Sequence, residues 1–157
     1  MHRAVSELFE APAFWSSLSG WMVASVLKIL VNWGRTRRVD FRCLTSLGGM
    51  PSAHSAMVSG LATSVGLSEG FGSTIFVVAL VFAVVVMFDA STVRRATGLQ
   101  AQLLNQIVDE VFKQHRLPIQ RLKEILGHTR MEVLVGMLVG ITAGVIINLA
   151  VDSSATG

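Results

Sequence analysis

The sequence predicts an all-α membrane protein, a polytopic bundle of about four transmembrane helices with one amphipathic helix on its cytoplasmic side. Of the 157 residues, 52% are hydrophobic and only 15% are charged, and the mean hydropathy is +0.60. These values depart from those of an ordinary soluble domain. Three apolar stretches, 13–33, 71–88 and 133–151, approach the roughly 20 residues that cross a bilayer core. We expect one membrane domain over residues 1–157.

The first span, 13–33, follows the acidic residues Glu7 and Glu10. The start of the chain lacks the basic segment, apolar run and small-residue cleavage site of a secretory signal, so we expect this span to be retained. Lys28 lies inside it. An ionisable side chain at such a position either faces the bundle interior or extends along apolar surface to the interface, and the sequence leaves both interpretations open.

The second span, 53–69, is shorter and contains serine and glycine, which indicates a helix that packs inside the bundle. The segment TSLGGMPSAHSA leads into it. Its glycines allow a turn or a close backbone approach, Pro51 suits a first helical turn, and Ser52 can cap the helix. His54 can donate a proton near neutral pH. The segment is therefore either a helix cap with an interfacial histidine or an anion site at a helix N-terminus.

The third span, 71–88, ends in the segment MFDASTVRRATG. An isolated carboxylate such as Asp89 is costly at the end of an apolar helix unless a cation pairs with it. Arg94 and Arg95 follow five and six residues later and can either neutralise it or bind phosphate oxygens through their planar guanidinium groups.

Residues 97–126 form the long stretch between the third and last spans. Apolar residues recur there at intervals of three and four, which predicts an amphipathic helix against the membrane or the bundle. Pro118 should interrupt this helix. We expect a short helix over 120–126 that ends at Gly127.

The last span, 133–151, is preceded by the segment LGHTRMEV. His128 and Glu132 are four residues apart and therefore share one face of a helix. A carboxylate in this position can fix the tautomer of a catalytic imidazole. An interfacial His/Glu pair without a catalytic role is the alternative.

The basic residues indicate the orientation of the chain. The net charge is +3 and the calculated isoelectric point is about 9.8. Arginines and lysines gather after the first span and between the third and the last, which four spans place on the same side of the membrane. By the positive-inside rule this side is cytoplasmic, and both termini lie opposite. Such a distribution favours anionic lipid headgroups over nucleic acid as the partner of the basic excess.

The three segments TSLGGMPSAHSA, MFDASTVRRATGLQAQLLNQI and LKEILGHTRMEVLVGMLVG, in this order, resemble the divergent branch of the type 2 phosphatidic acid phosphatases. This branch is also described as acid phosphatase/vanadium-dependent haloperoxidase-related proteins. The resemblance extends from about Lys28 to about Gly140. In the wider superfamily, basic residues and a serine hold the phosphate, one histidine protonates the leaving group, and another attacks phosphorus. The resemblance implies a reaction that needs neither a metal nor a cofactor.

Carried over by position, the resemblance assigns Ser52 to phosphate binding and His54 to the general acid, although Ala53 replaces the glycine of that motif. His128 with Glu132 reproduces the spacing of the nucleophilic histidine and its orienting carboxylate.

Lys28 and Arg35 match the first motif, in which six residues separate the two phosphate-binding cations. Thr36 replaces the usual proline of this motif, and Arg37 or Arg38 could serve in place of Arg35.

The last motif departs further from the family pattern. Leu122 stands where an arginine is expected, six residues before the histidine, so Arg94 or Arg95 would have to bind phosphate. Some relatives carry a histidine directly after the arginine pair, where this chain has Ala96. Either a nucleophile has been lost, or His128 is the relevant histidine. Asp89, close to this pair in the sequence, joins the catalytic candidates.

We therefore expect a membrane phosphatase that hydrolyses a phosphomonoester or pyrophosphate of a lipid or isoprenoid. The alternative is a membrane protein without catalysis that binds anionic lipid or a partner through the same basic pocket. Haloperoxidase activity follows only from superfamily kinship, and those enzymes are typically large soluble bundles.

Overall fold

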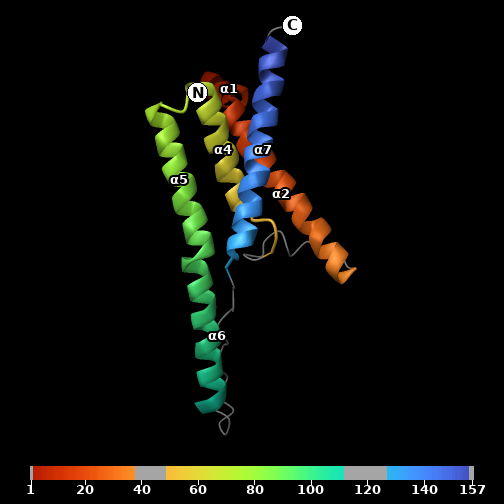
Figure 1. The fold of residues 1–157 in the computed structure, drawn as a ribbon, viewed down its shortest axis with the longest axis vertical. Helices are drawn as coiled ribbons and strands as arrows, with labels where there is room; N and C mark the ends of the chain where they lie inside the picture. The colour runs from red at the N-terminus through yellow and green to blue at the C-terminus, as the bar shows by residue number, and fades with distance from the viewer. Residues whose placement is uncertain (1, 38–48, 112–126, 156–157) are drawn as a thin grey trace.

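The computed structural model describes residues 2–37, 49–111 and 127–155 (Figure 1). These residues form helices and connecting turns, and no strand occurs among them. The helices are, in order, α1 (His2–Glu10), α2 (Pro12–Thr36), α4 (Ala53–Glu69), α5 (Thr74–Ser91), α6 (Val93–Val111) and α7 (Arg130–Ala155). The all-α fold class predicted from the sequence is confirmed.

Three helical segments are long and apolar enough to cross a membrane, namely Pro12–Thr36, Thr74–Val108 and Arg130–Ser154. The fourth helix of the bundle, α4, has 17 residues and a length of about 26 Å, somewhat less than the roughly 30 Å hydrocarbon core. It packs against α2, α5 and α7. The chain is thus an integral membrane protein whose shortest bundle helix is also its most central.

The four bundle helices alternate in direction along the chain, so that α4 and α7 run the same way. Helices α2 and α5 run from the end that carries the chain termini toward the opposite end, and α4 and α7 run back (Figure 1). Consequently α4 and α7 are parallel, and their N-termini lie at the same end of the bundle, away from both chain termini. Toward its own C-terminus, α2 leans away from the other helices (Figure 1).

Small side chains line the contacts between α2, α4 and α7. They recur every fourth residue, as Ser16, Gly20 and Ala24 on α2, Ala56, Gly60 and Ser64 on α4, and Gly136, Gly140 and Gly144 on α7. A Cβ atom on Gly20 would come within 2.6 Å of the Ala56 carbonyl oxygen, and one on Gly60 within 2.7 Å of the Ser16 carbonyl oxygen. Such close backbone contact is typical of helices that associate in lipid, where van der Waals packing replaces the hydrophobic effect.

Buried polar groups connect the same three helices. The Asn148 side-chain Nδ2 donates to Ser64 Oγ at 2.8 Å, to the Gly144 carbonyl oxygen at 2.7 Å and to Ser16 Oγ at 3.5 Å. Closer to the other end, Ser59 Oγ donates to the Met137 carbonyl oxygen at 3.1 Å. The bundle therefore has a small-residue, polar interior, and its large apolar side chains face outward, as expected for a protein in lipid.

Helix α5 packs mainly on α4. Its small residues Ala79 and Ala83 cluster with Val58, Ala62 and Val65 of α4. At its start, Ser73 caps the helix by accepting the Phe76 N–H at 3.2 Å.

The structure refines several boundaries predicted from the sequence. A short helix, α1, precedes the first span and has no predicted counterpart. Ser52 is the N-cap of α4, so Pro51 lies before the helix instead of in its first turn. Helix α6 begins at Val93, earlier than the predicted 97, and contacts only α5 among the described helices. It continues the direction of α5 and does not lie across the bundle (Figure 1). The predicted break at Pro118 and the helix over 120–126 fall outside the described residues.

Candidate functional site

Ser52, in the turn before α4, and Lys28, on α2, are both buried. Ser52 Oγ caps α4 by accepting the Ser55 N–H at 3.4 Å, and it also accepts the Ser55 hydroxyl at 2.9 Å. Gly49 has a φ of +102°, and a Cβ atom there would lie 2.9 Å from Lys28 Cε. The positive φ favours a glycine at this position, and the missing side chain leaves room for Lys28. Lys28 is only 6% exposed, so its ammonium is not simply extended to the interface.

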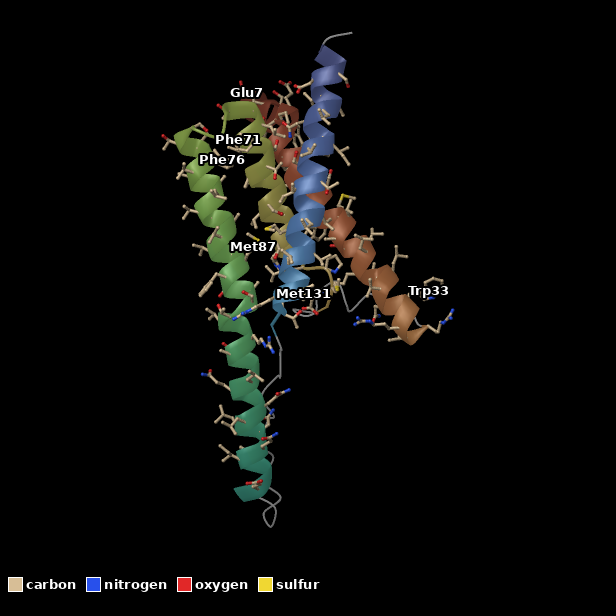
Figure 2. The ribbon with its side chains drawn as sticks, viewed as in Figure 1. Glu7, Trp33, Phe71, Phe76, Met87 and Met131 are labelled. Atoms are coloured by element: carbon tan, nitrogen blue, oxygen red, sulfur yellow. The ribbon has the colours of Figure 1, made fainter. Side chains whose placement is uncertain are left out.

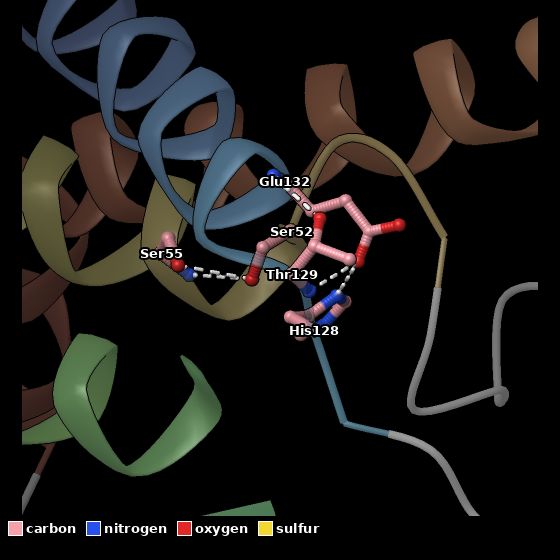
Figure 3. A network of polar contacts seen from close by, with 5 residues as sticks. All are labelled: Ser52, Ser55, His128, Thr129 and Glu132. Carbon is pink, nitrogen blue, oxygen red and sulfur yellow. Dashed lines mark hydrogen bonds and ion pairs between the residues drawn. The ribbon is translucent and has the colours of Figure 1, made fainter. Parts of the chain in front are cut away.

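The start of α7 holds His128, Thr129 and Glu132 in one hydrogen-bonded unit (Figure 3). Thr129 Oγ1 accepts the Glu132 N–H at 3.3 Å, and Glu132 Oε2 accepts the Thr129 N–H at 2.9 Å. This reciprocal pair is a capping box. The same Glu132 Oε2 lies 3.2 Å from His128 Nδ1. Because an ionised carboxylate only accepts, His128 Nδ1 carries the proton and Nε2 keeps its lone pair.

The N-termini of α4 and α7 touch at this site. The Ser52 N–H donates to the Glu132 carbonyl oxygen at 3.0 Å. Gly136 lies directly against the Ser52 backbone, and a Cβ atom on Gly136 would overlap the Ser52 carbonyl oxygen. Each helix N-terminus carries roughly half a positive charge, which favours an anion. At α7 the carboxylate of Glu132 already occupies part of this position.

Helix α5 also contacts the candidate site, through a backbone hydrogen bond to His128. The Ala90 carbonyl oxygen accepts the His128 N–H at 3.1 Å, which fixes the backbone of His128 while Glu132 fixes its ring. Asp89, the residue before Ala90, is half-buried at the same end of the bundle. His128 is thus held through its backbone by α5 and through its ring by Glu132 of α7, and the residue is 4% exposed.

Burial is the largest influence on the ionisation of His128 and lowers its pKa, because desolvation disfavours the imidazolium. The hydrogen bond and the charge of Glu132 oppose this effect, whereas the positive charges of Lys28 and His54 lower the pKa further. Both cationic groups therefore lie within electrostatic range of His128. A neutral imidazole at pH 7 is the form that a nucleophile requires.

Two substitutions are expected to shift the pKa of His128 in opposite directions. Glu132→Gln should lower it further, since the amide keeps an oxygen for the Thr129 cap but removes the charge that favours the imidazolium. Lys28→Met should raise it, since a cation is removed. NMR titration of the His128 ring measures both shifts, and shifts of the same sign would contradict the site geometry.

The same pKa predicts how stability depends on pH. The folded state binds the His128 proton more weakly than the unfolded state, whose pKa is about 6.5. This histidine therefore contributes stability above that value, and the contribution is lost as the pH falls from about 6.5 through the lowered pKa of the folded state.

The structure brings together only some of the residues that the sequence singled out. Lys28, Ser52, His54, His128 and Glu132 gather at the N-termini of α4 and α7. His54 is exposed on the first turn of α4, whereas the other four residues are buried or half-buried.

Arg35 and Arg37 do not join this group. Arg35 is exposed in the last turn of α2, beyond Trp33, which lies far from Met131 on the diverging part of that helix (Figure 2). Arg37 is exposed directly after α2, and Arg38 falls outside the described residues. On α6, Arg95 is exposed, and the side chain of Arg94 is not among those described.

Three groups that make hydrogen bonds in the site were not predicted from the sequence, namely Thr129, Ser55 and the Ala90 carbonyl oxygen. Thr129 could have been found from the sequence, because threonine followed three residues later by glutamate before an apolar run signals a capping box. Ser55 and the Ala90 carbonyl oxygen carry no comparable signal, since their contacts depend on how α4, α5 and α7 pack.

Comparison with known proteins gives two matches. The model of the divergent PAP2 family matches residues 9–143. The uncharacterized membrane protein YuiD of Bacillus subtilis (strain 168) is 39% identical over 137 residues, which cover 80% of this chain and 87% of YuiD. No solved structure matches this chain. The family match spans most of the chain, including all of α2, α4 and α5 and the first half of α7, and the chain therefore belongs to the divergent PAP2 family.

Proposed function

We propose that this chain is a membrane-embedded phosphatase that hydrolyses a phosphomonoester or pyrophosphate of a lipid or isoprenoid. The observation that carries the proposal is the buried His128, whose Nδ1 faces Glu132 Oε2 at 3.2 Å and whose backbone is bound by Ala90. The Glu132 contact at Nδ1 leaves Nε2 as the nucleophilic atom. Membership of the divergent PAP2 family supports the same class of hydrolase.

In the first step, His128 Nε2 attacks phosphorus, forming a P–N bond as the P–O bond to the lipid breaks. His54 gives its proton to the departing oxygen, so that the lipid leaves as an alcohol or, from a pyrophosphate, as a monophosphate. Glu132 stabilises the cationic phosphohistidine. Lys28, Ser52 and the N-termini of α4 and α7 stabilise the negative charge on the phosphoryl oxygens.

In the second step, water attacks the phosphohistidine. His54, now neutral, accepts a proton from this water, and the P–N bond breaks to release phosphate and restore His128. The cycle closes with each residue in its starting protonation state. No group outside the chain other than water is consumed.

The positive-inside rule supports a site on the cytoplasmic side, with both chain termini opposite. Arg35 and Arg37 at the end of α2, and Arg95 at the start of α6, lie toward the same end of the bundle as His128. In this orientation, the phosphate of a lipid in the cytoplasmic leaflet meets the N-termini of α4 and α7.

Phosphate release by the purified protein in detergent tests the proposal. The panel comprises phosphatidate, phosphatidylglycerophosphate, an isoprenyl diphosphate and a soluble phosphomonoester. We expect release from at least one lipid and a fall of roughly 100-fold or more in His54→Ala, because general acid catalysis typically contributes that much. Met57→Ala, at an exposed position one turn further along α4, is the matched control and should leave the rate unchanged.

The same panel separates the enzyme from a binding protein. A protein that only binds anionic lipid through Lys28 and the helix N-termini would release no phosphate and would bind phosphatidate equally well with or without His54. That outcome would overturn the phosphatase proposal.

A further inference from the structure

An apolar groove runs along the bundle between α4, α5 and α7. Its volume is about 370 Å³. Large apolar side chains from all three helices line it, among them Leu67, Leu80, Met87, Ile141 and Val145. Helix α5 packs mainly on α4 and has little contact with α7. The groove occupies the space between α5 and α7.

One end of the groove lies next to the candidate site. Met87 lines this end and precedes by three residues Ala90, whose carbonyl oxygen accepts the His128 N–H. Met137 lines it from α7, and its carbonyl oxygen is bound by Ser59 Oγ. Met87 lies toward the end of the bundle that carries Met131 and the start of α7 (Figure 2).

Two aromatic rings close the other end. Phe71 and Phe76 line the groove and meet edge to face, with ring centroids 5.1 Å apart. They pack over Gly66, where a Cβ atom would lie 2.7 Å from the Phe71 ring. From Phe76 to Met87 the groove follows 11 residues of α5 (76 to 87), or about 16 Å. The groove therefore extends along most of α5, from two residues after its start at Thr74 to four residues before its end at Ser91.

We propose that this groove holds the hydrocarbon chain of the phosphorylated substrate and that the Phe71–Phe76 pair limits the length of that chain. The inference rests on the proposed phosphatase function. A lipid with its phosphate between the N-termini of α4 and α7 lays its chain along α5 toward Phe76. Because bilayer lipid is as apolar as the groove, the groove contributes orientation and selectivity more than affinity.

A pair of tryptophan substitutions tests the groove. Both Leu80 and the adjacent Val81 are exposed, but only Leu80 lines the groove. We expect Leu80→Trp to lower kcat/KM for a long-chain phosphatidate by roughly tenfold or more. Short-chain phosphatidate and a soluble phosphomonoester should be hydrolysed as before. Val81→Trp should match the wild type on every substrate. Equal losses in both variants, or an equal loss on the soluble substrate, would overturn the proposal.

A separate variant tests whether the Phe71–Phe76 pair limits the length of the hydrocarbon chain. Removing the ring in Phe76→Ala opens the end of the groove, so the preferred phosphatidate should become longer. An unchanged preference, with the protein folded as judged by its helical circular dichroism, would contradict the role of the aromatic pair.

Photocrosslinking tests whether a lipid chain binds in the groove, independently of catalysis. Phosphatidate with a photoreactive diazirine at its chain end is incorporated into nanodiscs with the full-length protein. After irradiation, the crosslinked residues are mapped by mass spectrometry. We expect labelling around Phe71 and Phe76, suppressed by unlabelled phosphatidate but not by diacylglycerol.

Labelling spread over all lipid-facing helices, or confined to the separate depression between α2 and α7 lined by Val23 and Leu138, would overturn the groove proposal. Labelling at Phe76 without phosphate release from any substrate would instead overturn the phosphatase and leave the groove as the chain site of a lipid-binding protein.

Discussion

Replacing His128 with alanine is expected to lower the rate of phosphate release by roughly 10³-fold or more, because the proposed covalent route through Nε2 disappears. Binding of phosphatidate should persist, since Lys28 and the N-termini of α4 and α7 remain. The measurement is single-turnover phosphate release under the conditions in which the wild type is active, with lipid binding measured in parallel.

Thr129→Ala is the matched control for this variant. It removes the hydroxyl that caps α7 at Glu132 but leaves the His128 ring in place, and it should cost about 1 kcal/mol of stability. We expect Thr129→Ala to retain most of the activity. If His128→Ala and Thr129→Ala lost activity to the same extent, the loss would come from the start of α7 and not from the imidazole.

Replacing Gly140 with alanine is expected to disrupt the bundle despite the higher helix propensity of alanine. The added Cβ would overlap the Ala56 carbonyl oxygen and Ser59 Oγ, and the first of these is backbone that cannot move without shifting α4. Overpacking of this kind costs about 1–3 kcal/mol or more, against a gain of at most about 1 kcal/mol from propensity.

Gly34→Ala provides the comparison, since at that exposed position of α2 a Cβ would have no atom of the described residues within 4 Å apart from its chain neighbours and its own helix backbone. It should be neutral or slightly stabilising. Unfolding of both variants in mixed micelles, followed by circular dichroism, measures the difference. A Gly140→Ala protein as stable as the wild type would contradict the close α4/α7 contact.

The membrane helices were predictable because length and apolar content are local properties of the sequence. The long spans appear as α2, α5 and α7, and the predicted limits 53–69 coincide with α4. The parallel arrangement of α4 and α7 was not predicted, since it depends on which small-residue faces pack together. A signal for that packing was available, because glycine recurs every fourth residue at Gly136, Gly140 and Gly144.

The candidate site was predictable to the extent that its residues lie at helix starts. The spacing of His128 and Glu132 correctly placed both side chains in contact. The same reasoning fails for Arg35. Its spacing from Lys28 matches the family motif, but α2 leans out of the bundle toward its C-terminus, so Arg35 does not lie near the other site residues (Figure 1). The chemical role of each site residue stays a prediction.

The described part of the site holds sources of positive charge other than the predicted arginines. Lys28 is buried beside Gly49, and the N-termini of α4 and α7 meet through the Ser52–Glu132 backbone hydrogen bond. A buried cation and a helix N-terminus each favour an anion, and at the start of α7 the Glu132 carboxylate offsets part of this positive charge.

The measurement that tests the central claim most directly is the capture of a phosphorylated enzyme. Protein mixed with a lipid substrate carrying a radiolabelled phosphate is quenched rapidly in alkali, in which phosphohistidine survives, and the labelled peptide is mapped by mass spectrometry. The account predicts label on His128 that appears and decays within a turnover and is absent from His128→Ala. Turnover with label on His54, or with no labelled protein in a quench faster than the turnover time, would contradict it.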